Sequence, residues 1–237
     1  MPGGGRWSAA CPVWWSRRPW RVGWSGWSPA AAAGVCGGIP APAPRDSRVI
    51  ATELRSLPRT AGIAGPYVLI GASFGGLTAQ YLARTWPGDV AGVVLVDSTH
   101  PDLDRRIVEI GAEDRDERAA ALSRNAEGIG YEDLLRSDEL VRAAPKFPSA
   151  PLYVLRHGVS WDTDPDFKKP GAEGLWQELQ RDLAAQSPCA QLLSVPGTGH
   201  RIHEKRPDAV AHAIAAVRAV AARRSPGACG TPDPIAL

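Results

Sequence analysis

Residues 66–76 read Pro-Tyr-Val-Leu-Ile-Gly-Ala-Ser-Phe-Gly-Gly, and this stretch decides the fold. Residues 67–70 form a short apolar run rich in β-forming side chains, which is typical of a strand buried on both faces. The pattern G-x-S-x-G follows at residues 71–75, and residues 77–86 carry apolar side chains at helical spacing. The stretch therefore predicts a strand, a sharp turn and a helix in succession.

Ser73 stands at the centre of this turn. Gly71 and Gly75 supply the small residues that a strained strand-to-helix turn needs where the backbone passes close to itself. The serine would lie at a helix N-terminus, where backbone N–H groups favour developing negative charge. A plain glycine-rich connection is the structural alternative, but the flanking strand and helix favour a nucleophile. The chain has no G-x-G-x-x-G pattern and no Lys followed by Ser or Thr, which argues against nucleotide-binding loops.

Strands and helices alternate along the rest of the chain. The apolar runs predict strands at residues 90–96, 152–155 and 191–195 and helices at residues 48–60, 173–185 and 207–221. This alternation predicts an α/β fold with a mostly parallel sheet and helices on both faces.

A highly charged stretch, residues 101–148, separates the second and third of these strands. Its apolar positions keep helical intervals, so we expect two or three amphipathic helices. They could form a solvated crossover or a small helical cap over the active site, and a length of roughly 45 residues favours the cap.

Residues 1–45 differ in composition from the rest of the chain. They hold six of the nine tryptophans among Gly, Pro, Ser and Arg, with no Asp, Glu or Lys and no regular period. We expect an irregular or disordered segment, which an incorrect start site or a reading-frame shift could produce. An export signal and a membrane-surface patch are the alternatives, and the expected location is cytoplasmic.

Charge and cysteine content exclude several classes of function. The net charge of +2 falls on residues 1–45, which carry five arginines, whereas residues 46–237 hold 22 basic and 25 acidic groups. We therefore expect no binding to nucleic acid. No apolar run reaches the roughly 18 to 20 residues of a membrane span. The four cysteines lack C-x-x-C spacing, so we expect reduced thiols and no metal site or other cofactor.

The order of these parts resembles the α/β-hydrolase superfamily, in its small esterase-like branch. The resemblance covers about residues 40–220 and rests on three stretches: the G-x-S-x-G turn, Leu-Val-Asp-Ser-Thr-His-Pro at residues 95–101, and Gly-Thr-Gly-His at residues 197–200. It implies an α/β-hydrolase core at residues 46–237, with the cap inserted at about residues 101–148.

The resemblance implies a serine hydrolase that cleaves a small carboxylic ester, or a related acyl substrate, through an acyl-enzyme. Ser73 would be the nucleophile and His200 the base, since both follow predicted strands in the family's chain order. His203 is the alternative base. The orienting acid stays open between Asp97, at the end of the strand after the nucleophile, and Asp162, at the usual family position, with Asp164 beside it.

One part of the family pattern is absent from the sequence. Relatives have a His-Gly loop after an upstream strand that supplies one oxyanion amide, and the residue after the serine, here Phe74, supplies the other. This chain has no His-Gly before Ser73 and no readable early strands, so we expect an N-terminally incomplete fold. A weakly active or inactive remnant that binds a small ligand, and an acyltransferase, are the alternative functions. The sequence leaves the oligomeric state open.

Overall fold

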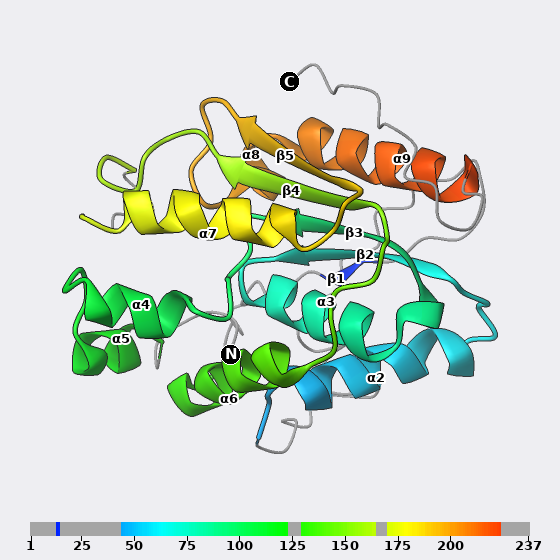
Figure 1. The fold of residues 1–237 in the computed structure, drawn as a ribbon, viewed down its shortest axis with the longest axis horizontal. Helices are drawn as coiled ribbons and strands as arrows, with labels where there is room; N and C mark the ends of the chain where they lie inside the picture. Colours follow the sequence, from blue (N-terminus) through cyan, green and yellow to red (C-terminus); the bar gives the residue numbers. More distant parts are fainter. Residues whose placement is uncertain (1–12, 15–43, 123–128, 165–169, 224–237) are drawn as a thin grey trace, which may run out of the picture.

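The computed structural model describes residues 13–14, 44–122, 129–164 and 170–223. Within these residues the strands form one sheet whose spatial order follows the chain. The strands are β1 (Val13–Trp14), β2 (Tyr67–Ala72), β3 (Val90–Val96), β4 (Leu152–His157) and β5 (Ala190–Val195). Strands β2 to β5 are mutually parallel, and β1 lies antiparallel to β2 (Figure 1).

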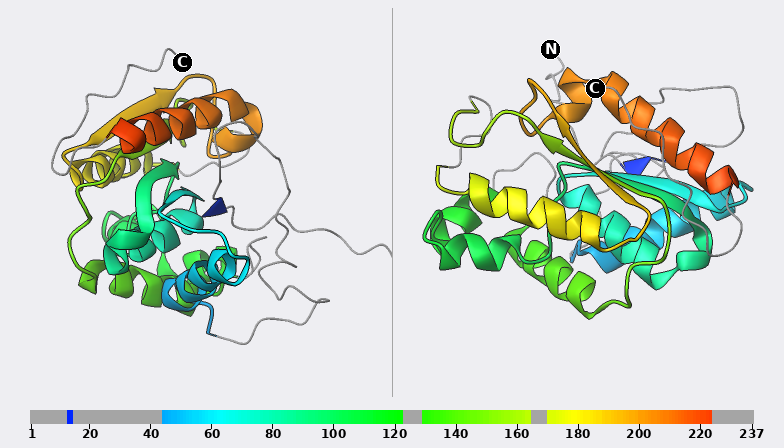
Figure 2. Two further views of the ribbon diagram at one scale, coloured as in Figure 1. Left: turned by 90° about the vertical axis from the view of Figure 1, so that its right-hand side faces the viewer. Right: turned by 45° about the horizontal axis from the view of Figure 1, so that its top comes forward.

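Helices cover both faces of the sheet. Helices α3 (Phe74–Thr85) and α7 (Glu173–Ala185) pack on one face, and α2 (Ser47–Thr60) packs outside α3. Helix α9 (Pro207–Arg223) packs on the other face, as Figures 1 and 2 show. Parallel strands buried in this way end at one common edge of the sheet, which is where ligands bind in open α/β folds.

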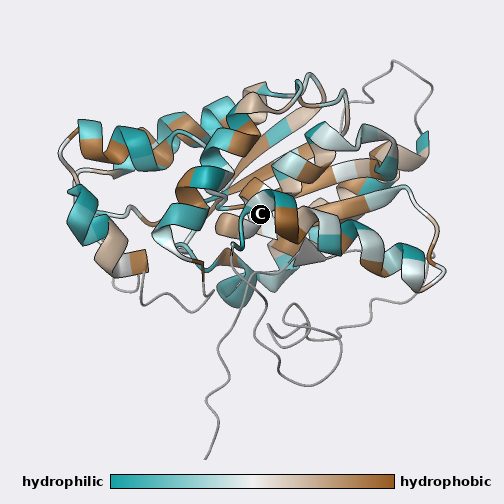
Figure 3. Cartoon of the chain, turned by 90° about the horizontal axis from the view of Figure 1, so that it is seen from below, coloured by the Kyte–Doolittle hydropathy of each residue, from teal (hydrophilic) through white to brown (hydrophobic). Residues whose placement is uncertain are grey.

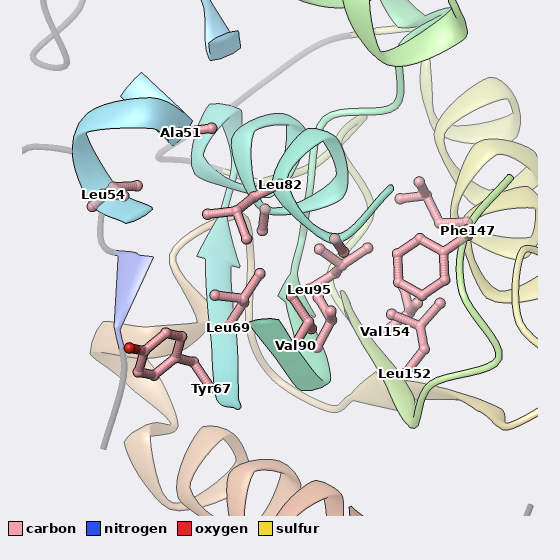
Figure 4. Packing of buried hydrophobic residues seen from close by; sticks show 14 residues of the cluster. Ala51, Leu54, Tyr67, Leu69, Leu82, Val90, Leu95, Phe147, Leu152 and Val154 are labelled. Atoms are coloured by element: carbon pink, nitrogen blue, oxygen red, sulfur yellow. The ribbon is translucent and has the colours of Figure 1, made fainter. Parts of the chain in front are cut away.

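The core consists of two layers because successive strand residues point to opposite faces. Val93 and Leu95 of β3 pack in the layer under α2, α3 and α7. Figure 4 draws the residues of this layer. Val94 and Val96 pack in the layer under α9. The strands accordingly carry mainly hydrophobic residues, whereas the helices carry both kinds (Figure 3). Burial on both faces explains why β2, β3 and β4 read as mainly apolar runs.

Three helices between β3 and β4 are called the inserted helices below: α4 (Leu103–Glu109), α5 (Arg115–Leu122) and α6 (Tyr131–Ala143). Apolar residues of α4 pack against α7, and those of α6 pack against α3. The short helices η1 (Pro87–Asp89) and α8 (Ile202–Lys205) precede β3 and α9. The expectation of two or three helices in this stretch is confirmed, and their action as a cap stays a prediction.

The α/β fold with a parallel sheet and helices on both faces is confirmed. Every strand expected after residue 66 is present, and α2 begins after Asp46, whose carboxylate accepts hydrogen bonds from two first-turn N–H groups. The short strand β1 was not expected, since residues 1–45 show no strand pattern. The irregular segment expected there otherwise lies outside the described residues.

The structure bears on two expectations that were drawn from composition, one about the cysteines and one about membrane-spanning segments. Cys189 is buried and disulfide-bonded, so the expectation of reduced thiols is wrong at this position; the other three cysteines lie outside the described residues. No helix within the described ranges is both long and apolar enough to span a bilayer.

Candidate active site

The turn after β2 holds Ser73 in a backbone conformation that is unusual for a residue with a side chain. Its φ of 51° and ψ of −127° lie in a sparsely populated region, which stores strain at functional sites. Gly71 is needed beside it, because a Cβ there would lie 2.5 Å from the carbonyl oxygen of Gly75. The serine is half-buried at the start of α3, at the edge of the sheet where β2 ends.

His200 approaches Ser73 from the loop after β5. Its Nε2 lies 3.1 Å from the Ser73 Oγ. The loop is fixed by the Thr198 carbonyl, which accepts from two backbone N–H groups after β4, and by the Asp164 carboxylate, which accepts from the His200 N–H at 3.2 Å. Gly197 takes the left-handed conformation that the turn requires, with φ of 70°. These contacts fix the loop backbone that carries the imidazole.

Asp97 completes a hydrogen-bonded chain of three side chains. It follows β3 directly, has a φ of 43°, and its Oδ2 lies 2.8 Å from the His200 Nδ1. A carboxylate accepts a hydrogen bond, so His200 donates from Nδ1 and leaves Nε2 as the acceptor for the Ser73 hydroxyl. Geometry therefore connects the serine, the histidine and the acid in the order that acyl transfer by a serine needs.

The Asp97 carboxylate is completely buried and has further donors. The His157 backbone N–H lies 3.1 Å from Oδ1, the His157 Nδ1 lies 2.9 Å from Oδ2, and the Trp176 Nε1 lies 3.1 Å from Oδ1. Burial by itself would raise the pKa of Asp97, but the hydrogen bonds from His157 and His200 outweigh it, so the pKa is lowered. Asp97 stays ionised at neutral pH.

His157 is the residue of this site that sequence reasoning missed. Its position two residues after the strand expected at residues 152–155 predicts loop structure, and this prediction is wrong, because His157 is the last residue of β4 and is fully buried beside Asp97. Its Nε2 lies 3.1 Å from the Glu173 carboxylate. Burial would lower the pKa of His157, yet the hydrogen bonds to Asp97 and Glu173 raise it. One signal was available: His157 comes shortly after the strand expected at residues 152–155, as Asp97 comes directly after the strand expected at residues 90–96.

A sequence profile of the alpha/beta hydrolase family matches residues 14–213. The chain belongs to this family. The match begins upstream of the expected start near residue 40, so it includes part of the segment whose sequence shows no readable strands. No curated protein matches the chain.

Several solved structures are similar to this member of the alpha/beta hydrolase family. The Mycobacterium tuberculosis protein Rv0554 is 20% identical, with 77% of this chain and 76% of that one covered and a TM-score of 0.48. A thermophilic esterase from Thermogutta terrifontis is 25% identical over 73% of this chain and 72% of its own, with a TM-score of 0.45. An esterase from Exiguobacterium antarcticum is 12% identical over 73% and 74%, with a TM-score of 0.46.

The other candidates for the acid and the base are placed differently from Asp97 and His200. Asp162 is exposed, and its carboxylate accepts from Ser160 and from the Gly171 N–H. Asp164 is buried, and its carboxylate accepts from the backbone N–H of His200. His203 lies on α8, where its Nε2 is 3.8 Å from Glu204. The acid that the structure brings to the His200 ring is Asp97.

Phe74 is the first residue of α3, so its N–H is one of those that a helix cannot pair with its own carbonyls. This amide belongs to the residue directly after Ser73. The glycine-rich stretches at residues 3–5 and 37–38, which follow no readable strand in the sequence, lie outside the described residues.

Proposed function

We propose that the protein is a serine hydrolase that cleaves a small carboxylic ester through an acyl-enzyme. The observation that carries the proposal is the hydrogen-bonded chain from Ser73 Oγ to His200 Nε2 at 3.1 Å and from His200 Nδ1 to Asp97 at 2.8 Å. A free hydroxyl is a weak nucleophile near neutral pH, and an adjacent imidazole with a free Nε2 lone pair is the group that activates it. Membership in a hydrolase family agrees with this chemistry.

In the proposed reaction the Ser73 oxygen attacks the ester carbonyl while His200 Nε2 takes the hydroxyl proton. The tetrahedral intermediate carries its negative charge on the former carbonyl oxygen, toward which the Phe74 N–H donates. His200 then gives the proton to the alkoxide as the carbon–oxygen bond breaks, and the alcohol leaves. Water, activated by the same imidazole, hydrolyses the ester bond to Ser73 and releases the acid.

Asp97 has a separate role in the proposed mechanism. By accepting from Nδ1, it selects the tautomer of His200 whose Nε2 can receive the serine proton, and it stabilises the imidazolium that forms. Its lowered pKa keeps the carboxylate ionised across the pH range in which His200 acts as a base. Asp97 is therefore the proposed orienting acid in preference to Asp162.

We assign the inserted helices the role of a cap beside the site. Leu134 and Val141 of α6 pack in one apolar cluster with Phe74, the residue next to the nucleophile. The Arg142 guanidinium at the end of α6 also donates to the carbonyl of Pro101, in the segment that leaves Asp97. A displacement of α6 would thus reach both the nucleophile turn and the acid loop.

A fluorophosphonate probe tests the proposed function, because it reacts only with an activated serine. Wild-type protein is expected to be labelled, and Ser73→Ala is expected to lose the label together with roughly 10⁵-fold or more of kcat on a p-nitrophenyl ester. Ser56→Ala is a matched control, since Ser56 is an exposed residue of α2 whose hydroxyl donates to the backbone carbonyl of Glu53. Folded wild-type protein that takes no label would instead support a remnant without activity.

A further inference from the structure

His157 lies between two carboxylates, which are presented by different elements. Its Nδ1 is 3.0 and 2.9 Å from the two Asp97 oxygens, and its Nε2 is 3.1 Å from Glu173 on α7. The ring is fully buried. Neither nitrogen faces a group that can donate, because an ionised carboxylate has only acceptor oxygens. The contacts therefore fit a ring that carries a proton on both nitrogens.

The aromatic surroundings of His157 suit a positive charge as well. Trp161 stacks on the ring at 5.4 Å between centroids with planes at 23°, and Trp176 at 6.1 Å with planes at 15°. A cation over the face of an indole is attracted by the ring's quadrupole. The same Trp176 donates its Nε1 proton to Asp97, so its indole contacts the histidine and the acid together.

Glu173 is itself held in a fixed position. Its Oε2 accepts from the Trp161 backbone N–H at 2.8 Å, and its Oε1 accepts from the Gln177 side chain at 2.6 Å. Among the described residues, the charged groups that contact the His157 ring are Asp97, which follows β3, and Glu173 of α7. His200, on the loop after β5, bonds to the same Asp97 oxygen.

We propose that His157, held by Glu173, is a positioning residue that acts as a buried imidazolium and fixes the Asp97 carboxylate toward His200. It provides two of the donors on Asp97, one from the backbone and one from the ring, and it neutralises a charge that is completely buried. A buried carboxylate with neutral donors alone would take up a proton more readily, and a protonated Asp97 no longer orients His200. This inference rests on the proposed serine hydrolase mechanism.

The kinetic test compares pH profiles of kcat/KM for a p-nitrophenyl ester. In His157→Gln the acid limb is expected to move up by about one pH unit, with kcat lowered roughly 10-fold or more at pH 6 and KM little changed. Glu173→Gln keeps a hydrogen-bonding partner for the ring and removes only the charge, so it should move the limb by less. His212→Gln, an exposed residue on α9, is the matched control. If His157→Gln lowered kcat/KM equally at every pH and left the acid limb at the same pH, the proposal would be overturned.

A spectroscopic test decides the charge on His157 without measuring activity. In protein labelled with ¹⁵N-histidine, one ring is expected to keep protons on both nitrogens above pH 7, and its signals should be absent in His157→Gln. In Glu173→Gln the same ring should lose a proton at lower pH than in the wild type. A ring with a single proton at pH 7 in the wild type, or no change in Glu173→Gln, contradicts the proposal. If no ester is hydrolysed, the proposed function fails while this titration still decides the state of His157.

Discussion

Two buried aspartates, one at the edge of the sheet and one in the inserted helices, have opposite electrostatics. Asp97 is 0% exposed and Asp138 is 1% exposed, so burial does not distinguish them. Hydrogen bonds from His157 and His200 overcome the burial of Asp97, whose pKa is lowered. At Asp138, burial and the nearby Asp104 charge raise the pKa to about 9. The partners of a carboxylate, and not its depth, decide its charge.

The difference extends to the regions around the two residues. Both oxygens of Asp97 have N–H donors from β4, α7 and the loop after β5. In the inserted helices, Arg118 donates to one oxygen of Asp104 at 2.5 Å. The second oxygen of Asp104 and one oxygen of Asp138 have no hydrogen-bond partner within the described part of the chain. The hydrogen-bond donors at the sheet edge stabilise the ionised form of Asp97, whereas the surroundings of Asp138 favour its neutral form.

The largest effect is expected from replacing Asp97. Asp97→Asn keeps the size of the side chain but turns an amide toward His200 or His157, which favours the wrong imidazole tautomer. We expect kcat for ester hydrolysis to fall on the order of 10⁴-fold, with a much smaller change in KM. Steady-state kinetics measure the fall, and circular dichroism checks that the variant is folded. A loss below about 10-fold would mean that another group orients His200.

Replacing Asp138 should be favourable, because we expect it to increase the free energy of unfolding. Because the folded-state pKa of about 9 lies above the ordinary value of 3.8, the folded protein keeps a proton that the unfolded chain releases. Its stabilising contribution is complete below about pH 4 and is lost progressively as the pH rises toward 9. Asp138→Asn removes this loss, so its free energy of unfolding should exceed that of the wild type by roughly 1–3 kcal/mol at pH 8.

Urea unfolding at pH 5 and pH 8 measures this effect. The advantage of Asp138→Asn over the wild type should be larger at pH 8 than at pH 5, since the wild type alone carries the titrating carboxyl. An advantage that is equal at both pH values, or a loss that grows at pH 8, would show that Asp138 is ionised and paired in the folded protein.

The sequence predicts those parts of the fold whose contacts are local or repetitive. Strand β3 and helix α7 were predicted with the residues that the structure assigns, because an apolar run between turn residues and a helical stripe define their ends. Strand β1 was not predicted, since two residues have no period of their own. Their pairing depends on Gly71 and Ile70, more than fifty residues away.

The candidate site likewise contains residues that local sequence patterns predict and residues that depend on distant contacts. Ser73 and His200 stand in motifs that follow strands, so their sequence context is enough to name them as candidates. The choice among Asp97, Asp162 and Asp164 depends on which side chain turns toward the His200 ring, and no pattern in one sequence encodes that direction. His157 shows the limit most clearly, because its two acidic partners lie 60 residues before it and 16 residues after it.

The smallest effect is expected from replacing Asp162. This residue extends the comparison of the two buried aspartates to a carboxylate that is exposed to water. Asp162 is exposed, and its hydrogen bonds go to Ser160 and Gly171 in its own loop. Asp162→Ala should therefore change kcat/KM by no more than about 2-fold, because a carboxylate that does not orient the base contributes little to the transition state. The ratio of kcat/KM between Asp162→Ala and Asp97→Asn, measured in parallel, distinguishes an acid that orients His200 from one that does not. If Asp162→Ala lost as much activity as Asp97→Asn, the loop after β4 would have to move in the working enzyme, and the assignment of Asp97 would no longer hold.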